Sequence, residues 1–208
     1  MPASNYDSSV FINCPFDDAY QRLFDAIVFC VYDCGFSARS ALEVDDGAQV
    51  RIDKIYRIIA ECKFGIHDLS RIEINPETGL PRFNMPLELG IFLGARKYGQ
   101  AEQREKRVLI LDREEYRYLN FISDIRGQDI KAHNSDERIV ITLVRNWLRN
   151  ALAGAGISIP SGVLIFKRYK IFQDELPDLC EFFRLDPNEL VFNDYIQVVE
   201  EWLDANPW

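Results

Sequence analysis

Two carboxylates in the first half of the chain have the setting that chemistry at an anomeric carbon requires. Asp68 ends the apolar run Phe64–Asp68, and Glu88 stands early in an apolar segment from about Pro86 to Arg96. One carboxylate can stabilise or trap an oxocarbenium-like centre while another acid serves the departing base. The alternative is structural: Asp68 closes the turn after its strand, and Glu88 neutralises the positive end of its helix.

Two arginines near these segments are candidates for holding a substrate phosphate. A guanidinium group binds phosphate bidentately, so Arg39 and Arg82 would favour a nucleotide or NAD over a free nucleoside. The alternative is that they form surface ion pairs with acids such as Glu43, Asp45 or Asp46.

Smaller groups complete the candidate substrate-binding set. Asn13 is a candidate for orienting a sugar hydroxyl, and its alternative role is to close its own turn. Phe16 is a candidate for stacking on a base, with core packing as the alternative. The other candidates beside these segments are Pro15, Ser70 and Asn84.

Other kinds of catalytic site lack the residues that they need. The sequence contains no Ser/His/Asp combination with a plausible oxyanion loop and no phosphate loop of the GxxxxGKS or GxGxxG kind. The five cysteines are scattered through apolar segments and are interpreted as reduced core residues. With two histidines in the chain, we expect no metal site, and the proposed chemistry needs no cofactor.

Apolar runs typical of strands alternate with segments of helical spacing along the first half of the chain. The expected strands are Val10–Asn13, Phe36–Arg39, Phe64–Asp68 and Arg107–Asp112. The expected helices run from Asp17 or Asp18 to Gly35, over Val50–Ile59, and from about Pro86 to Arg96. This alternation predicts a doubly wound α/β domain with a parallel sheet of four to five strands. Its functional crevice would lie beyond the carboxyl ends of the strands.

The helix that carries Glu88 is expected to serve this crevice directly. Its first turn would point Asn84 and Glu88 toward the crevice, while Gly90 and Gly94 would let the helix lie close to the sheet. The polar segment Ser123–His133 is interpreted either as a lid over the crevice or as turns capped by aspartates.

The last third of the chain changes character. We divide the chain into an α/β domain, residues 1–135, and a helical extension packed on it, residues 136–208. Expected helical segments are Ile139–Leu152, Phe166–Phe172, Leu176–Phe183 and Tyr195–Leu203, with Gly154, Gly156, Pro160 and Gly162 marking a boundary. The aromatic-rich C-terminal helices are first a packing surface, and an exposed part would bind a protein partner or a second copy of the chain.

Charge and hydropathy exclude several classes of partner. The chain has 208 residues with 24 Lys and Arg against 33 Asp and Glu, a formal net charge of -9. This balance argues against broad nucleic-acid binding and against an anionic membrane surface. No apolar run approaches the roughly 20 residues of a spanning helix, and the N-terminus lacks a signal-peptide pattern. We therefore expect a soluble, cytoplasmic protein.

Three segments resemble the nucleoside 2-deoxyribosyltransferases. The sequence Val10-Phe11-Ile12-Asn13-Cys14-Pro15-Phe16 resembles their first-strand segment, Ile66–Ser70 their strand that ends in Asp, and Met85–Ala95 their Glu-x-Gly helix. The resemblance implies that Glu88 is the nucleophile that holds the sugar and that Asp68 contacts or protonates the base. The chain departs from the family in the insertion Arg71–Phe83 and in the helical extension.

A related group widens what the resemblance implies. TIR-like NAD hydrolases share this flavodoxin-like topology and use a Glu in the corresponding region, and many bacterial members are effectors of anti-phage defence. The expected function is therefore cleavage of an N-glycosidic bond, by hydrolysis or transfer, in a nucleotide, nucleoside or NAD-like substrate. The alternative is a non-catalytic module of TIR-like fold that binds a nucleotide signal or another protein.

Overall fold

The computed structural model describes residues 6–72, 74, 79–152 and 158–208, and these form a sheet of five parallel strands. The strands are β1 (Ser9–Asn13), β2 (Ser37–Arg39), β3 (Phe64–Asp68), β4 (Arg107–Asp112) and β5 (Lys131–Ala132). Their order is β2-β1-β3-β4-β5, which is the flavodoxin-like order, with the topological switch point between β1 and β3. The predicted doubly wound α/β fold is confirmed.

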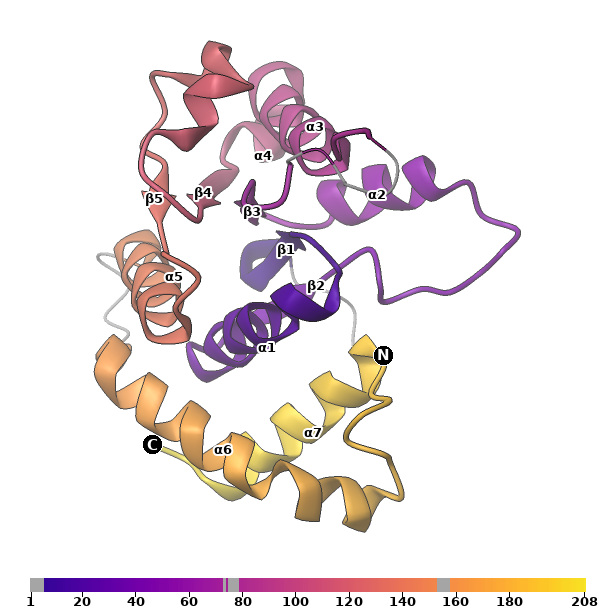
Figure 1. The fold of residues 1–208 in the computed structure, drawn as a ribbon, viewed down its shortest axis with the longest axis vertical. Coiled ribbons are helices and arrows are strands. Elements are labelled where there is room, and N and C mark those ends of the chain that lie inside the picture. The colour runs from indigo at the N-terminus through magenta and orange to yellow at the C-terminus, as the bar shows by residue number, and fades with distance from the viewer. Residues whose placement is uncertain (1–5, 73, 75–78, 153–157) are drawn as a thin grey trace.

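Helices cover both faces of this sheet (Figure 1). On one face lie α1 (Asp18–Asp33) and α5 (Glu137–Ala151), and on the other lie α2 (Arg51–Ala60) and α3 (Asn84–Tyr98), followed by the short α4 (Ala101–Arg104). Short 3-10 turns lie at η1 (Tyr6–Ser8), η2 (Arg117–Asn120) and η3 (Ser123–Ile125). Strands covered on both faces are apolar along their whole length, which is why β1, β3 and β4 could be predicted from the sequence.

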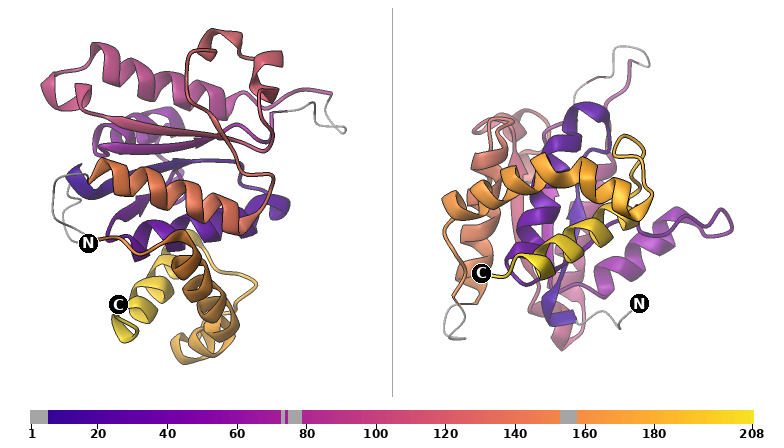
Figure 2. Two further views of the ribbon diagram at one scale, coloured as in Figure 1. Left: turned by 90° about the vertical axis from the view of Figure 1, so that its left-hand side faces the viewer. Right: turned by 90° about the horizontal axis from the view of Figure 1, so that it is seen from below.

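Helices α6 (Gly162–Phe183) and α7 (Phe192–Ala205) pack against the side of α1 that faces away from the sheet (Figure 2). Phe29 of α1 contacts Phe172 of α6 at 5.2 Å and Trp202 of α7 at 5.7 Å between ring centroids. One hydrophobic cluster therefore runs from the sheet through α1 and α5 into α6 and α7.

One expectation about helices needs correction. The separate helical segments Phe166–Phe172 and Leu176–Phe183 are one helix, α6, which continues through Pro177. Buried residues on either side of that proline, Phe172 and Cys180, hold both halves against the core, so tertiary packing outweighs the lost backbone hydrogen bond. The boundary markers Gly154 and Gly156 lie outside the described residues.

The close contact between α3 and the sheet also depends on a different glycine from those expected. A Cβ added at Gly90 or Gly94 would meet nothing within 4 Å, so neither position is needed for close approach. A Cβ at Gly65 of β3 would instead lie 2.7 Å from the Phe92 ring and 2.9 Å from His67 Nε2. The missing side chain of Gly65 is what lets α3 pack on β3.

Replacing Gly65 by alanine is therefore expected to lower the free energy of unfolding by about 1–3 kcal/mol, because Phe92 and the strand must move apart. The matched control, Gly90→Ala in an open helical position, should instead raise it by roughly 0.5–1 kcal/mol. Urea denaturation of the two variants measures both effects. A Gly65→Ala variant as stable as the wild type would contradict this packing.

Candidate functional site

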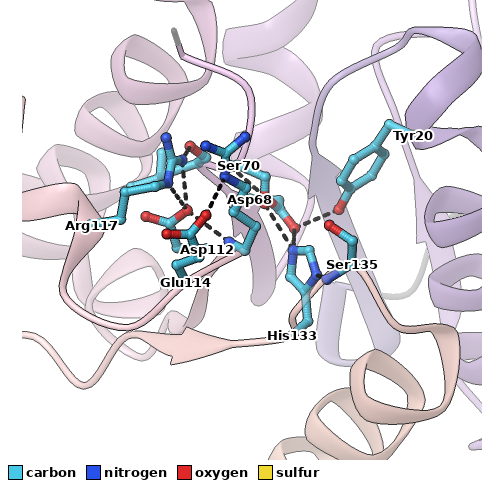
Figure 3. Close-up of polar contacts among 10 residues, drawn as sticks. Tyr20, Asp68, Ser70, Asp112, Glu114, Arg117, His133 and Ser135 are labelled. Atoms are coloured by element: carbon cyan, nitrogen blue, oxygen red, sulfur yellow. Dashed lines mark hydrogen bonds and ion pairs between the residues drawn. The ribbon is translucent and has the colours of Figure 1, made fainter.

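Asp68, at the carboxyl end of β3, has no exposed surface and is held by donors from distant parts of the chain (Figure 3). The Tyr20 hydroxyl of α1 donates to Oδ2 at 2.5 Å, and the Ser70 backbone N–H donates to Oδ1 at 2.8 Å. His133 Nε2, just after β5, lies 2.9 Å from Oδ2. Burial by itself would raise the pKa of Asp68, but the hydrogen bonds from His133, Ser70 and Tyr20 hold it below its usual value.

The His133 ring joins Asp68 to Ser70 in an arrangement that differs from a nucleophilic triad. Its Nδ1 accepts the Ser135 backbone N–H at 3.0 Å, so the ring N–H is on Nε2. That same nitrogen lies 2.8 Å from Ser70 Oγ and 2.9 Å from Asp68. A triad needs the serine and the carboxylate on opposite ring nitrogens, with the nitrogen facing serine unprotonated. This network therefore positions the loop after β3 and does not activate Ser70.

A second carboxylate, Asp112 at the end of β4, pairs with Arg117 through Oδ1, while its Oδ2 is buried without a hydrogen bond from the described residues. Arg117 donates to Asp112 Oδ1 from Nε at 2.8 Å and from Nη2 at 2.6 Å, and Nη2 also donates to the Leu69 carbonyl at 2.6 Å (Figure 3). Burial raises the pKa of Asp112, and Arg117 offsets part of that rise. Asp68 and Asp112 together hold the carboxyl edges of β3, β4 and β5 in place.

Glu88 of α3 is the carboxylate that differs from this pattern. The residue is 6% exposed, and its side chain has no hydrogen bond or ion pair with the described part of the chain. Burial raises the pKa of Glu88 to about 7, and the positive charge of Arg51, the first residue of α2, counteracts only part of this rise. A carboxylate without partners in a site of low polarity is poised to gain or lose a proton near neutral pH.

Asp68 and Glu88 reach the carboxyl edge from opposite faces of the sheet. Along β3, Asp68 points toward Tyr20 on the α1 face, whereas His67 contacts Phe92 on the α3 face. Both carboxylates act on Cys14, whose buried thiol has a raised pKa because of burial first and then the charges of Asp68 and Glu88. The structure thus brings the predicted pair to one edge of the sheet, but only Glu88 has any exposed surface.

Asn13 ties the start of α3 to the sheet. Its Nδ2 donates to the Met85 carbonyl at 2.9 Å and lies 2.9 Å from His67 Nδ1. The structure therefore uses this amide to position the helix that carries Glu88. His67 is fully buried, and burial lowers its pKa to about 3.

The two candidate arginines both form ion pairs. Arg39 donates from Nε and Nη2 to Glu43 at 2.7 Å, and Nη2 also pairs with Glu61 at 2.8 Å. Arg82 pairs more loosely with Asp17, at 3.3 Å. The surface ion pair with Glu43, which the sequence offered as the alternative for Arg39, is what the structure contains.

The remaining candidates differ in their access to solvent. Phe16 is 37% exposed and packs edge-to-face on Phe24, and Asn84 is exposed at the start of α3. Pro15 and Ser70 are buried. Phe16 and Asn84 are therefore the members of this set that are open to solvent.

Sequence reasoning missed the partners of these carboxylates: Tyr20, Arg51, Arg117 and His133. The end of the segment Ser123–His133 adds to the sheet as β5 and leaves His133 buried beside Asp68, which neither the lid nor the turn interpretation predicted. His133 follows its strand as Asp68 ends β3, so recognising β5 would have found it. A strand of two residues carries too little periodicity to be recognised.

A cavity of about 720 Å³ lies next to the carboxyl edge of the sheet. It is lined by α1, residues 41–45, Arg51 and Lys54 of α2, Leu176 of α6, residues 187, 188, 190 and 191, and the first turn of α7. Asn193 donates to the Glu43 carbonyl at 3.1 Å, and the Tyr195 hydroxyl donates to the Asp25 carbonyl at 3.2 Å, so the C-terminal helices close the cavity. Its size suits a nucleotide-sized molecule. Arg51 lines it and also acts on Glu88.

Comparison with known proteins does not identify this site. No family model, curated protein or solved structure matches the chain. Within the described residues, no helix is long and apolar enough to cross a membrane. The same part of the chain contains no cluster of three or more His, Cys, Asp or Glu side chains suited to a metal ion.

Removing the Tyr20 hydroxyl is expected to destabilise the protein, because Asp68 loses a hydrogen bond while its charge stays buried. Tyr20→Phe should lower the free energy of unfolding by about 1.5–3 kcal/mol. Tyr98→Phe, at a residue 84% exposed, is the control and should change it by less than about 0.5 kcal/mol. Equal stability of the two variants in urea would show that Tyr20 does not stabilise the Asp68 charge.

The raised pKa of Glu88 predicts a stability change that needs no substrate to measure. Because its folded pKa of about 7 exceeds the usual 4.5, the folded state binds the extra proton between these values, and stability falls as pH rises through 7. Glu88→Gln removes this cost, so its effect on the free energy of unfolding should be about 2–3 kcal/mol more favourable at pH 8 than at pH 5. Glu181→Gln, an exposed control on α6, should show no such dependence.

Proposed function

We propose that this protein cleaves an N-glycosidic bond in a nucleotide, nucleoside or NAD-like substrate, with Glu88 as the group that receives the sugar. The observation that carries the proposal is the Glu88 carboxylate, which is nearly buried, lacks a partner in the described chain and has a pKa raised to about 7. The resemblance of Met85–Ala95 to the Glu-x-Gly helix of nucleoside 2-deoxyribosyltransferases supports the same assignment.

The proposed reaction follows from this setting. The ionised Glu88 oxygen bonds to the anomeric carbon as the carbon–nitrogen bond breaks, and the base leaves with the electron pair and takes up a proton. Water or a second base then displaces the carboxylate, which gives hydrolysis or transfer. A carboxylate removed from water stabilises positive charge on the sugar more strongly than a hydrated one.

Other residues act in this proposal by positioning. Asp68 holds the loop after β3 through Ser70 and His133, and Asn13 holds the first turn of α3. Arg51 would neutralise a substrate phosphate in the adjacent cavity while keeping part of Glu88 ionised. The fully buried Asp68 is thus assigned a structural part, with the departing base taking its proton from solvent.

Incubation with NAD and a panel of nucleosides and nucleotides, followed by chromatography, tests the proposal. The wild type should release a free base from at least one of them, and Glu88→Gln should reduce that release by about a thousandfold or more, because the nucleophile is lost. Glu181→Gln should behave as the wild type does. Unchanged release by Glu88→Gln, or no release by the wild type, would contradict the assignment.

The pH dependence of the same reaction separates a nucleophile from a proton donor. A nucleophilic Glu88 must be ionised, so kcat/KM should rise with pH through about 7 and then level off. Replacing Arg51 by Gln removes a positive charge that favours the ionised Glu88, so the pKa of Glu88 should rise further. The increase of kcat/KM should then occur at higher pH. A rate that falls through pH 7 would assign Glu88 as the acid instead.

A nucleotide-signal-binding module is a second candidate function, and the cavity closed by the C-terminal helices favours it. A ligand there would contact both the start of α2 and the segment before α7. Its binding would therefore link the α/β domain to the C-terminal helices. This candidate predicts a rise in melting temperature with one member of the same panel and no released base.

A further inference from the structure

A concentration of positive side chains lies at the amino edge of the sheet, opposite to Glu88. A groove of about 530 Å³ there is lined by Lys63, Arg96, Arg104, Lys106 and Arg107, with Glu105, Val108 and Trp147 completing its wall. We call this the basic groove. It holds five cationic side chains and one acid in a chain whose net charge is -9. Such a departure from the overall charge is a local feature of the surface.

Some of these cations have partners within the protein. Lys106 is buried and donates to the Ile59 carbonyl at 2.6 Å, and Lys63 pairs with Asp7 at 2.8 Å. Arg104 donates to the Gly99 carbonyl at 3.0 Å. Three of the five cationic side chains thus already have partners within the protein and stabilise its own fold.

Arg96 and Arg107 are different. Both are exposed, and neither has a side-chain hydrogen bond or ion pair with the described residues. Arg96 lies in the last turn of α3, where a cation stabilises the helix end. Arg107 begins β4 and has no helix end to stabilise. Two guanidinium groups therefore face one groove with their donors available.

The backbone leaves this groove open. Within the described chain β5 pairs only with Leu111 and Asp112, so the outer edge of β4 near Val108 has no strand beside it. In Figure 1, β4 lies between the layer of α3 and α4 and helix α5. Trp147 of α5 forms part of the opposite wall and packs edge-to-face on Phe64 at 5.7 Å.

We propose that the basic groove binds a small phosphate-bearing anion of nucleotide size, held by Arg96 and Arg107. The planar fork of each guanidinium matches phosphate oxygens bidentately, and the groove volume is in the range of small-molecule sites. A long polyanion would extend onto the negatively charged remainder of the surface, whereas a small anion stays within the groove. This site is separate from the Glu88 edge and does not depend on the chemistry proposed there.

Calorimetric titration of the full chain with ATP and with pyrophosphate at low salt tests the proposal. We expect saturable binding that weakens as salt is added, because the interaction is electrostatic. The double variant Arg96→Gln/Arg107→Gln should lose at least tenfold in affinity. A double control, Arg57→Gln/Arg126→Gln, makes the same change of charge outside the groove and should bind as the wild type does.

Glu88→Gln separates this site from the proposed active site, since ATP could also enter the latter. Pyrophosphate binding that survives Glu88→Gln and is lost in Arg96→Gln/Arg107→Gln supports the basic groove. Binding lost in Glu88→Gln but kept in the double arginine variant overturns it, as does the absence of binding in the wild type. A 20-base-pair DNA duplex that binds as tightly as ATP would also overturn the proposal.

Discussion

The burial on all sides of the second half of α1 is the constraint on which the rest of the structure depends. Residues 26–31 of this helix have no exposed surface. A helix that is apolar all round must be covered all round, and each square ångström of apolar surface left in water would cost roughly 25 cal/mol. The sheet covers one side, α5 lies alongside, and α6 and α7 cover the side away from the sheet. The C-terminal helices are therefore part of the main core, and the position of α1 sets Tyr20 against Asp68.

The carboxyl edge shows how buried charge is distributed. Both Asp68 oxygens accept hydrogen bonds, whereas Asp112 accepts them at Oδ1 and its Oδ2 is buried without a hydrogen bond from the described residues. Glu88 is buried without such donors, and its pKa rises accordingly. An unsatisfied group of this kind destabilises the folded state at high pH, which is typical of residues retained for chemistry. Burial also raises the pKa of Asp25 to about 7, but Asp25 accepts a hydrogen bond from Gln21, whereas Glu88 has no hydrogen bond or ion pair with the described residues.

The parallel sheet separates two surfaces of opposite character. Its carboxyl ends bring together Asp68, Asp112 and, from α3, Glu88, whereas its amino ends carry the basic groove. All strands run in the same direction, so residues before β3 and β4 gather at one edge and residues after them gather at the other. A chain with this topology can hold separate sites for an electrophilic sugar and for an anion without their charges interfering.

The sequence by itself determined the strands β1, β3 and β4, the helices α1 to α3 and the sheet class, because these elements depend on local apolar periodicity. It also placed Asp68 and Glu88 at one edge, since parallel strands all end on the same side. Tertiary structure alone decided the burial, the hydrogen-bond partners and the pKa of each carboxylate. Asp68 accepts a hydrogen bond from Tyr20, which is 48 residues away, and Ser70 is hydrogen-bonded to His133, which is 63 residues away. His133 follows β5, a strand of two residues that is too short to give a recognisable sequence pattern. The pKa of a buried carboxylate depends on its desolvation and on neighbours that come from remote segments of the chain. The sequence therefore could not show that Asp68 is fully buried and hydrogen-bonded whereas Glu88 lacks a partner among the described residues.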